Sequence, residues 1–310
     1  MKRRLLDFLV CPDCGNELDL KTDLMEGSEI KEGSLSCSKC KREFPIRDFI
    51  PRFVDTDKYV DSFSFEWNTF YDVQMDILNN TDESDKTFRY KTGWKPEDLK
   101  NELILDIGIG AGRFADIVSG WGGEVVGIDL SFAVEAAFKN VGKRPNVHII
   151  QADIFNLPLK NEVFDHMYSI GVLHHTPDTK KAFMSVVPFL KKGGEFAVFI
   201  YDKGIYHRYS DLWRKVTVRL PLRVMYILSA ISIPLYYIHT IPFLGPALQF
   251  ALPTANWPKW RWRWLDTFDW YTPKYQWKHT YPEVYQWYKD NGFENIELFD
   301  YPVCMRGKKN

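Results

Sequence analysis

The chain has 310 residues, of which 45% are hydrophobic, and this is enough for one large core and a small accessory domain. Its formal net charge of −1 lacks the basic excess from which nucleic-acid enzymes gain affinity, so nucleic acid is not the partner we expect. The first residues lack the apolar run of a signal peptide. Four of the five cysteines form C-x-x-C pairs, which indicates a cytoplasmic protein that uses thiols to bind metal.

The first 54 residues contain both cysteine pairs, Cys11-Pro-Asp-Cys14 and Cys37-Ser-Lys-Cys40. Each pair can aim two thiolates at one ion, and four thiolates make a closed tetrahedral Zn²⁺ site without an open position for catalysis. Residues 44–46 and 50–53 are predicted strands of a ribbon. The segment resembles the zinc domains related to Trm112, and also the zinc finger at the head of some ribosomal-RNA guanine methyltransferases. This resemblance implies a structural zinc-binding ribbon at 1–54, used for support or for docking a substrate.

Residues 55–101 are polar with interspersed aromatic side chains, and the run 79–85 is a predicted loop. A short apolar run, Leu103–Ile107, then has the pattern of a buried strand, and a turn with three glycines follows it. A helix opens at Arg113, and Val125–Asp129 is a second predicted strand with an acid at its carboxyl end. This order predicts one nucleotide-binding half of a doubly wound α/β sheet, with Asp129 placed to hold ribose hydroxyls.

The glycine spacing distinguishes two cofactors. Dinucleotide folds prefer G-x-G-x-x-G, whereas this chain has G-x-G-x-G at 108–112 with Asp106 just before it. That pattern resembles motif I of the class I S-adenosylmethionine (SAM) methyltransferases, as do Asp129, residues 152–153 and residues 169–175. The resemblance implies a seven-stranded Rossmann-like sheet with its SAM-binding core at 102–201. It also implies that 55–101 forms helices covering the SAM site. A nicotinamide enzyme is the alternative.

The same resemblance implies a set of cofactor-binding residues around the carboxyl ends of the strands. Asp153 would recognise the adenine amine, and Leu157-Pro158 would form an apolar wall of the adenine pocket. The residues implied to bind SAM are Asp106, Gly108, Gly110, Gly112, Asp129, Leu130, Asp153, Ile154 and Ser169.

Two adjacent histidines follow the fourth predicted strand, and on extended backbone only one of them would face the ligand. His174 is a candidate substrate contact or base; the alternative is a histidine satisfied by backbone groups. Thr176 is predicted to cap the next helix, with Pro177 at its first position. Residues 191–194 are predicted to end that helix, and 195–201 to form the fifth strand.

Residues 202–276 are predicted to form an insertion, and its composition differs from that of the core. Residues 224–258 contain no Asp, Glu, Lys or Arg, while arginines precede this stretch and a run of tryptophans and cations follows it. Such flanks are typical of a membrane interface, but four prolines and a glycine argue against one straight spanning helix. Two alternatives remain: 219–264 lies on the inner face of a membrane, or it forms a helical lid whose apolar faces line a pocket or a homodimer contact. Both favour an apolar or lipid-linked acceptor.

The last segment, 277–310, returns to the core. Thr280 is predicted to cap a helix at 282–291, and 295–299 and 302–305 resemble the last two strands of the methyltransferase sheet, one of them antiparallel. His279 is a second candidate base, unless it pairs with Asp266 or Asp269 as part of the scaffold.

The sequence therefore predicts an enzyme that transfers a methyl group from SAM to a small-molecule, sugar or lipid-linked acceptor, in a biosynthetic pathway. A histidine that titrates near neutral pH would suit a hydroxyl acceptor. One alternative is an RNA (rRNA or tRNA) base methyltransferase that docks RNA through the zinc domain. A non-catalytic module that recruits a partner is another.

Overall fold

The computed structural model describes residues 1–54, 59–204, 207–300 and 303–310. Within the first of these ranges, a 3₁₀ turn at Arg3–Asp7 precedes a four-stranded antiparallel sheet in the order β1-β2-β3-β4. The two strands predicted for the ribbon correspond to β3 and β4. The hairpin of β1 and β2 is not among the predicted strands, because most side chains of β1 are exposed and no buried alternation marks it. The strands are β1 (Leu18–Glu26), β2 (Glu29–Cys37), β3 (Glu43–Arg47) and β4 (Ile50–Pro51).

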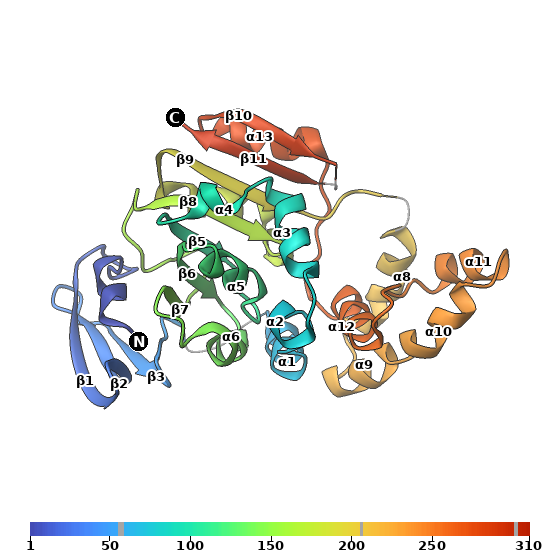
Figure 1. The fold of residues 1–310 in the computed structure, drawn as a ribbon, viewed down its shortest axis with the longest axis horizontal. Coiled ribbons are helices and arrows are strands. Elements are labelled where there is room, and N and C mark those ends of the chain that lie inside the picture. The colour runs from blue at the N-terminus through green and yellow to red at the C-terminus, as the bar shows by residue number, and fades with distance from the viewer. Residues whose placement is uncertain (55–58, 205–206, 301–302) are drawn as a thin grey trace.

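A seven-stranded sheet in the order β10-β11-β9-β8-β5-β6-β7 forms the core of the chain (Figure 1). Neighbouring strands from β9 to β7 run parallel, while β11 is antiparallel to both β9 and β10. The predicted α/β sheet with one antiparallel strand is therefore confirmed, although residue 302 of the last predicted strand lies outside the described residues. The strands are β5 (Leu103–Ile107), β6 (Glu124–Asp129), β7 (Val147–Gln151), β8 (Phe164–Ile170), β9 (Leu190–Phe199), β10 (Phe293–Phe299) and β11 (Cys304–Lys309).

Four helices connect and cover these strands: α5 (Arg113–Gly120), α6 (Ala133–Val141), α7 (Thr179–Val186) and α13 (Tyr281–Asp290). The predicted cap of the last helix is present, since the Thr280 side chain accepts from the Glu283 N–H and the Glu283 carboxylate accepts from the Thr280 N–H. The predicted cap of α7 is wrong. Thr176 donates its hydroxyl to the Leu173 carbonyl at 2.7 Å, and Asp178 caps the helix instead.

Two other predicted boundaries are also wrong. Residues 191–194 do not end a helix but belong to β9, because α7 stops at Val186 and a 3₁₀ turn at Val187–Phe189 follows it. Pro188 in that turn has no N–H to continue α-helical bonding. The predicted loop at 79–85 shrinks to 80–82, since α3 already begins at Glu83.

The remaining helices come from the segment before β5 and from the insertion after β9. In Figure 1, α12 lies beside α1 and α2, whereas α9, α10 and α11 project away from the sheet. Apolar side chains, among them Phe70, Val73, Trp262 and Leu265, pack α12 against the first segment. The helices are α1 (Asp61–Thr69), α2 (Asp76–Asn79), α3 (Glu83–Thr92), α4 (Pro96–Leu99), α8 (His207–Thr217), α9 (Leu222–Ser229), α10 (Ser232–His239), α11 (Leu244–Ala251) and α12 (Trp260–Tyr271).

One stretch of the insertion, Leu222–His239, is long and apolar enough to cross a membrane by length and composition, and 22% of it is buried inside the protein. It has 18 residues and a mean hydropathy of 1.2. It contains two helices, because α9 ends at Ser229 and α10 begins at Ser232.

The zinc ribbon packs against the β7 edge of the large sheet. The backbone of Leu9 bridges that of Leu159, and the Val10 N–H donates to the Pro158 carbonyl at 3.0 Å. Leu157 is 6% exposed and belongs to an apolar cluster shared by both sheets. Leu157 and Pro158 pack against the zinc ribbon and are outside the described lining of the cavity, so the adenine wall there stays a prediction.

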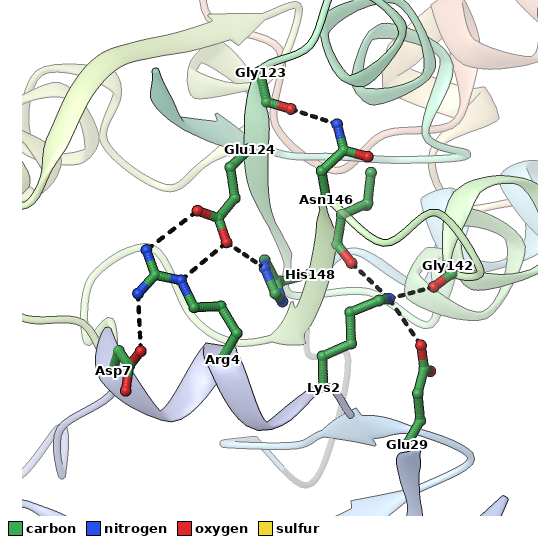
Figure 2. A network of polar contacts seen from close by, with 10 residues as sticks. Lys2, Arg4, Asp7, Glu29, Gly123, Glu124, Gly142, Asn146 and His148 are labelled. Atoms are coloured by element: carbon green, nitrogen blue, oxygen red, sulfur yellow. Dashed lines mark hydrogen bonds and ion pairs between the residues drawn. The ribbon is translucent and has the colours of Figure 1, made fainter. Parts of the chain in front are cut away.

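Polar contacts at the same edge come from the residues before β1 (Figure 2). The Lys2 ammonium donates to the carbonyls of Gly142 at 2.7 Å and Val147 at 2.9 Å. Arg4 pairs with the Glu124 carboxylate at 3.3 Å. The Lys2 contacts are largely shielded from solvent, so they bind the ribbon more strongly than an exposed ion pair would.

We predict that Lys2→Ala lowers the free energy of unfolding by about 1–3 kcal/mol, because it leaves two backbone carbonyls and Glu29 without their donor. Thermal unfolding followed by circular dichroism measures this as a fall in Tm. Lys21→Ala is the control, since Lys21 is 72% exposed and should change the stability by less than about 0.5 kcal/mol. Equal effects of the two substitutions would contradict the assigned role.

Candidate functional site

The turn after β5 is built from three glycines, whose φ angles are +84°, +52° and +87° at Gly108, Gly110 and Gly112. A Cβ on Gly108 would lie 2.4 Å from Val172, and one on Gly110 would lie 3.3 Å from the Trp67 ring. Glycine is required here both for the left-handed backbone and for the close approach of neighbouring side chains. The turn is consequently a narrow cradle that α1 closes through Trp67.

The Asp129 carboxylate ties this turn to the end of β6. It accepts from the Gly110 N–H at 3.0 Å, from the Ser131 N–H at 2.9 Å and from the Ser131 hydroxyl at 2.7 Å. Burial raises the pKa of Asp129, while these hydrogen bonds favour the charged form. The acid that the sequence places for ribose recognition therefore stands directly beside the glycine turn.

A cavity of about 870 Å³ begins at this turn and continues between α1 and α12. Its volume is near the upper end of the range for ligand pockets, about 300–1,000 Å³, which leaves room for a second ligand beside a nucleotide. Aromatic side chains from both helices line the part between them. Of the residues predicted to bind the cofactor, those that line the cavity are Gly108, Gly110, Asp129, Leu130 and Ile154.

The other predicted cofactor residues are outside the described cavity lining: Asp106, Gly112, Asp153 and Ser169. Asp106 is 3% exposed, and burial raises its pKa to about 7. Ser169 is buried and donates its hydroxyl to the Ile107 carbonyl at 3.2 Å, so it joins β8 to β5. Gly112 lies at the start of α5, and Asp153 follows β7. These four residues shape the elements around the cradle, and their contact with SAM stays a prediction.

The paired histidines lie in a 3₁₀ turn and not on the extended backbone that the sequence predicts. His175 lines the cavity, with its Nδ1 2.8 Å from the Tyr275 carbonyl, and burial lowers its pKa to about 3. His174 is fully buried, stacks on the Tyr201 ring at 4.0 Å between centroids, and is not part of the described cavity lining. This placement favours His175 over His174 as the histidine that meets a ligand.

His279 also lies outside the described cavity lining. Its Nδ1 is 3.6 Å from the Glu283 carboxylate, and its ring packs on Trp287. The expected scaffold pairing with Asp266 or Asp269 is therefore replaced by a contact within one helical turn. Burial lowers the pKa of His279, which directly precedes Thr280, the cap of α13.

Several charged residues that the sequence does not single out as ligand contacts line the cavity: Glu66, Lys91, Arg113, Asp266 and Asp269. Burial lowers the pKa of Lys91 to about 7 and that of Arg113 to about 10. Burial also raises the pKa of Asp266 to about 7 and that of Asp269 to about 6. The one feature of the sequence that points to these charged residues as a group is the spacing of Asp266 and Asp269, which are three residues apart on a helix.

The zinc ribbon brings its four thiols together. All four Sγ atoms lie within 4.8 Å of one another, and in a tetrahedral site with Zn–S bonds of about 2.3 Å they would be about 3.8 Å apart. Gly15 and Lys41 have φ angles of +71° and +63°, and their N–H groups donate to the carbonyls of the first cysteine of each pair. The donor set fits a structural zinc ion. It is formed by Cys11, Cys14, Cys37 and Cys40.

Comparison with known families matches both parts of the chain. Residues 105–198 match the family described as a methyltransferase domain, and residues 2–48 match the family described as Trm112p-like protein. Residues 105–198 are therefore a methyltransferase domain. The predicted resemblance to a SAM-dependent methyltransferase with a Trm112-like zinc domain is confirmed. The predicted cofactors, SAM and a structural zinc ion, fit these two domains.

Curated relatives of the methyltransferase domain act on different acceptors. The chain is 29% identical to phosphoethanolamine N-methyltransferase 2 from Caenorhabditis elegans, over 54% of this chain and 38% of that protein. It is 33% identical to tRNA U34 carboxymethyltransferase from Pseudomonas paraeruginosa, over 42% of this chain and 40% of that protein. The chain thus spans about two fifths of the length of these relatives.

Two solved structures are similar to parts of the chain. A SAM-dependent methyltransferase from Mesorhizobium loti is 31% identical, with a TM-score of 0.30, and the match covers 32% of this chain and 46% of that chain. A complex of the Haloferax volcanii Trm112 methyltransferase activator with a methyltransferase matches 79% of this chain and 96% of that chain, at 12% identity and a TM-score of 0.48.

We predict that removal of zinc unfolds the ribbon. Structural zinc contributes on the order of 10 kcal/mol to the folding of small zinc domains, and this ribbon has little core of its own. Cys14→Ser, or a strong chelator, should lower Tm and expose 1–54 to protease. Metal content measured by plasma mass spectrometry should fall in Cys14→Ser and stay unchanged in the control Cys304→Ala, whose thiol is buried in the large sheet. Full zinc content in Cys14→Ser would contradict the site.

Proposed function

We propose that the protein is a SAM-dependent methyltransferase that acts on a small-molecule, sugar or lipid-linked acceptor in a biosynthetic pathway. The observation that carries this proposal is the single cavity that joins the glycine turn to a chamber between α1 and α12. A donor held at the turn and an acceptor in the chamber would share one enclosed space. Enclosure matters because methyl transfer needs the two reacting atoms aligned and water excluded.

SAM, when bound, supplies a methyl group on a positively charged sulfur, so the leaving group needs no activation by the protein. Asp129 would hold the ribose hydroxyls at the edge of the turn, and Trp67 would cover the turn from the α1 side. Lys91 can hold or release a proton at Nζ near neutral pH, because its pKa is lowered to about 7. His175 stays neutral at that pH, so it can position a polar group of the acceptor.

An RNA base methyltransferase is the second candidate, and the tRNA-modifying relative at 33% identity favours it. In that case the zinc ribbon would hold RNA. Residues 1–54, however, contain ten Lys and Arg against ten Asp and Glu, so the ribbon offers no net positive charge for phosphates. RNA binding by the full chain that weakens as salt is added would favour the RNA methyltransferase over the small-molecule enzyme.

Binding of SAM, measured by isothermal titration calorimetry, tests the cofactor directly. We predict that Gly110→Arg weakens it by about 100-fold or more, because the new side chain starts 3.3 Å from the Trp67 ring and fills the cradle. Gly27→Arg is a matched control: its φ of +62° is as strained as the +52° of Gly110, but the hairpin tip is open space. Unchanged SAM affinity in Gly110→Arg would count against the proposal.

We further propose that 219–264 lies on the inner face of a membrane, where a lipid-linked acceptor would be found. The helices that project from the sheet carry exposed apolar side chains, including Ile227 at 71%, Tyr237 at 68% and Phe243 at 95% exposure. Residues 202–276 contain ten Lys and Arg against four Asp and Glu, and three of those acids line the cavity. Apolar side chains flanked by cations suit the headgroup region of an anionic bilayer.

We predict that the protein sediments with vesicles of phosphatidylglycerol and phosphatidylcholine, and that Ile227→Asp with Phe243→Asp weakens this binding at least about tenfold. The control pairs Leu24→Asp with Ile77→Asp, which are 50% and 72% exposed but lie outside the insertion. SAM affinity should be the same in both double variants. Failure of the wild type to sediment would overturn the membrane proposal and leave the methyltransferase proposal intact.

A further inference from the structure

Three carboxylic acids from two helices meet at the cavity: Glu66 from α1, and Asp266 and Asp269 from α12. Glu66 is the most exceptional of them. It is 0% exposed, and neither of its Oε atoms has a hydrogen-bond partner among the residues that the structure describes. A buried carboxyl group without a partner costs free energy, so Glu66 lowers the free energy of unfolding of the protein.

The two aspartates have partners, and each of these is a neutral donor. Asp266 accepts from the Gln74 amide at 3.3 Å and from the Trp257 indole at 2.5 Å. Asp269 accepts from the Tyr201 hydroxyl at 3.2 Å. Hydrogen bonds of this kind orient the carboxylates but do not neutralise their charge.

The three acids also act on one another. Burial raises the pKa of Glu66 well above its usual range, and the charges of Asp269 and then Asp266 raise it further. Asp269 likewise raises the pKa of Asp266. Such mutual repulsion means that a positive charge placed among the three carboxyl groups would be strongly favoured.

Two cations line the same cavity, but each is directed to other groups. The Arg113 guanidinium donates to the Gln74 amide oxygen at 2.6 Å and lies over the Phe114 ring at 4.4 Å. The Lys91 ammonium lies over the Phe199 ring at 3.6 Å. Their charges lower the pKa of Asp266, but less than burial and Asp269 raise it.

The walls around the acids are aromatic. Trp67 from α1 and Trp262 and Trp270 from α12 line the cavity together with the carboxyl groups. Faces of tryptophan rings attract cations, and the effect is strongest where water is excluded. Carboxyl groups framed by indole rings are a combination that selects an ammonium group over a neutral hydroxyl or a phosphate.

We infer that the chamber between α1 and α12 binds an acceptor that carries a cationic amine, with Glu66 as its main counter-charge and Asp266 and Asp269 in support. This inference rests on the proposed methyltransferase function, because it names the acceptor class for the same cavity. SAM carries a cationic amine of its own, so the test must separate the two amines.

The experiment compares choline, which has a permanent positive charge, with 3,3-dimethylbutan-1-ol, a neutral molecule of nearly the same shape. Calorimetric titrations use the full chain saturated with S-adenosylhomocysteine, whose own affinity is measured first. We expect choline to bind the wild type at least about tenfold more tightly than the neutral analogue does. Glu66→Gln, which keeps the shape and removes the charge, should weaken choline binding at least about tenfold and leave the affinity for S-adenosylhomocysteine unchanged.

Glu97→Gln is the matched control, since Glu97 lies exposed on α4, and it should behave like the wild type. Glu66→Gln should retain or raise Tm, because it replaces a buried carboxyl group whose ionisation burial and the two aspartates oppose. Equal binding of choline and its neutral analogue, or no saturable choline binding, overturns the inference while SAM binding still supports the methyltransferase. Loss of S-adenosylhomocysteine binding in Glu66→Gln also overturns it and assigns Glu66 to the donor's amine. A wild type that binds neither SAM nor S-adenosylhomocysteine refutes the proposed function itself.

Discussion

The hydrogen bond from the Gly110 N–H to the Asp129 carboxylate is the contact on which the rest of the site depends. It joins the turn after β5 to the end of β6, which are neighbouring parallel strands. The turn donates this bond from a left-handed backbone, and a Cβ on Gly108 or Gly110 would come too close to Val172 or Trp67. A short stretch of glycine backbone therefore sets both the position of the acid and the distance at which α1 covers it.

Beyond this contact, the walls of the cavity are formed by segments that are distant from one another in the sequence. α1 lies between the zinc ribbon and the sheet in sequence, and α12 lies in the insertion after β9, yet Trp262 and Leu265 pack against Phe70 and Val73. The chamber exists only because these two helices meet. The insertion is consequently both a lid, in that α12 completes the cavity, and a separate projecting surface made by α9 to α11. Of the two alternatives left open by the sequence, the lid describes α12, and a membrane contact of α9 to α11 stays a proposal.

The sequence predicted the parts of the molecule whose signals are local. A buried apolar run, a glycine turn and an acid lie within 27 residues from Leu103 to Asp129, and the structure has the strands at those positions. Boundary errors arose where two capping residues competed: Thr176 and Asp178 are both good caps, and only the bond from Thr176 to Leu173 decides between them. The acids of the chamber could not be predicted, because Glu66 lies 200 residues before Asp266 and no spacing rule connects them. The packing of Leu157-Pro158 could not be predicted for a related reason, since its partner surface is Leu9 and Val10 of another domain.

The place of the zinc ribbon limits what it can do. It packs on the β7 edge, and the Arg52 guanidinium donates to the Gln151 amide oxygen at 2.8 Å, while the Phe53 N–H donates to the Gln151 carbonyl. Gln151 is the last residue of β7, and Ala152 and Ile154, which follow it in the chain, line the cavity. The insertion lies on the other side of the sheet from the ribbon (Figure 1). A ribbon in this position supports the wall where the nucleotide end of the cavity begins, and it stands away from the chamber between α1 and α12. A role in holding that wall rigid follows from these contacts, whereas a role in presenting an acceptor to the chamber would require the acceptor to span the whole sheet.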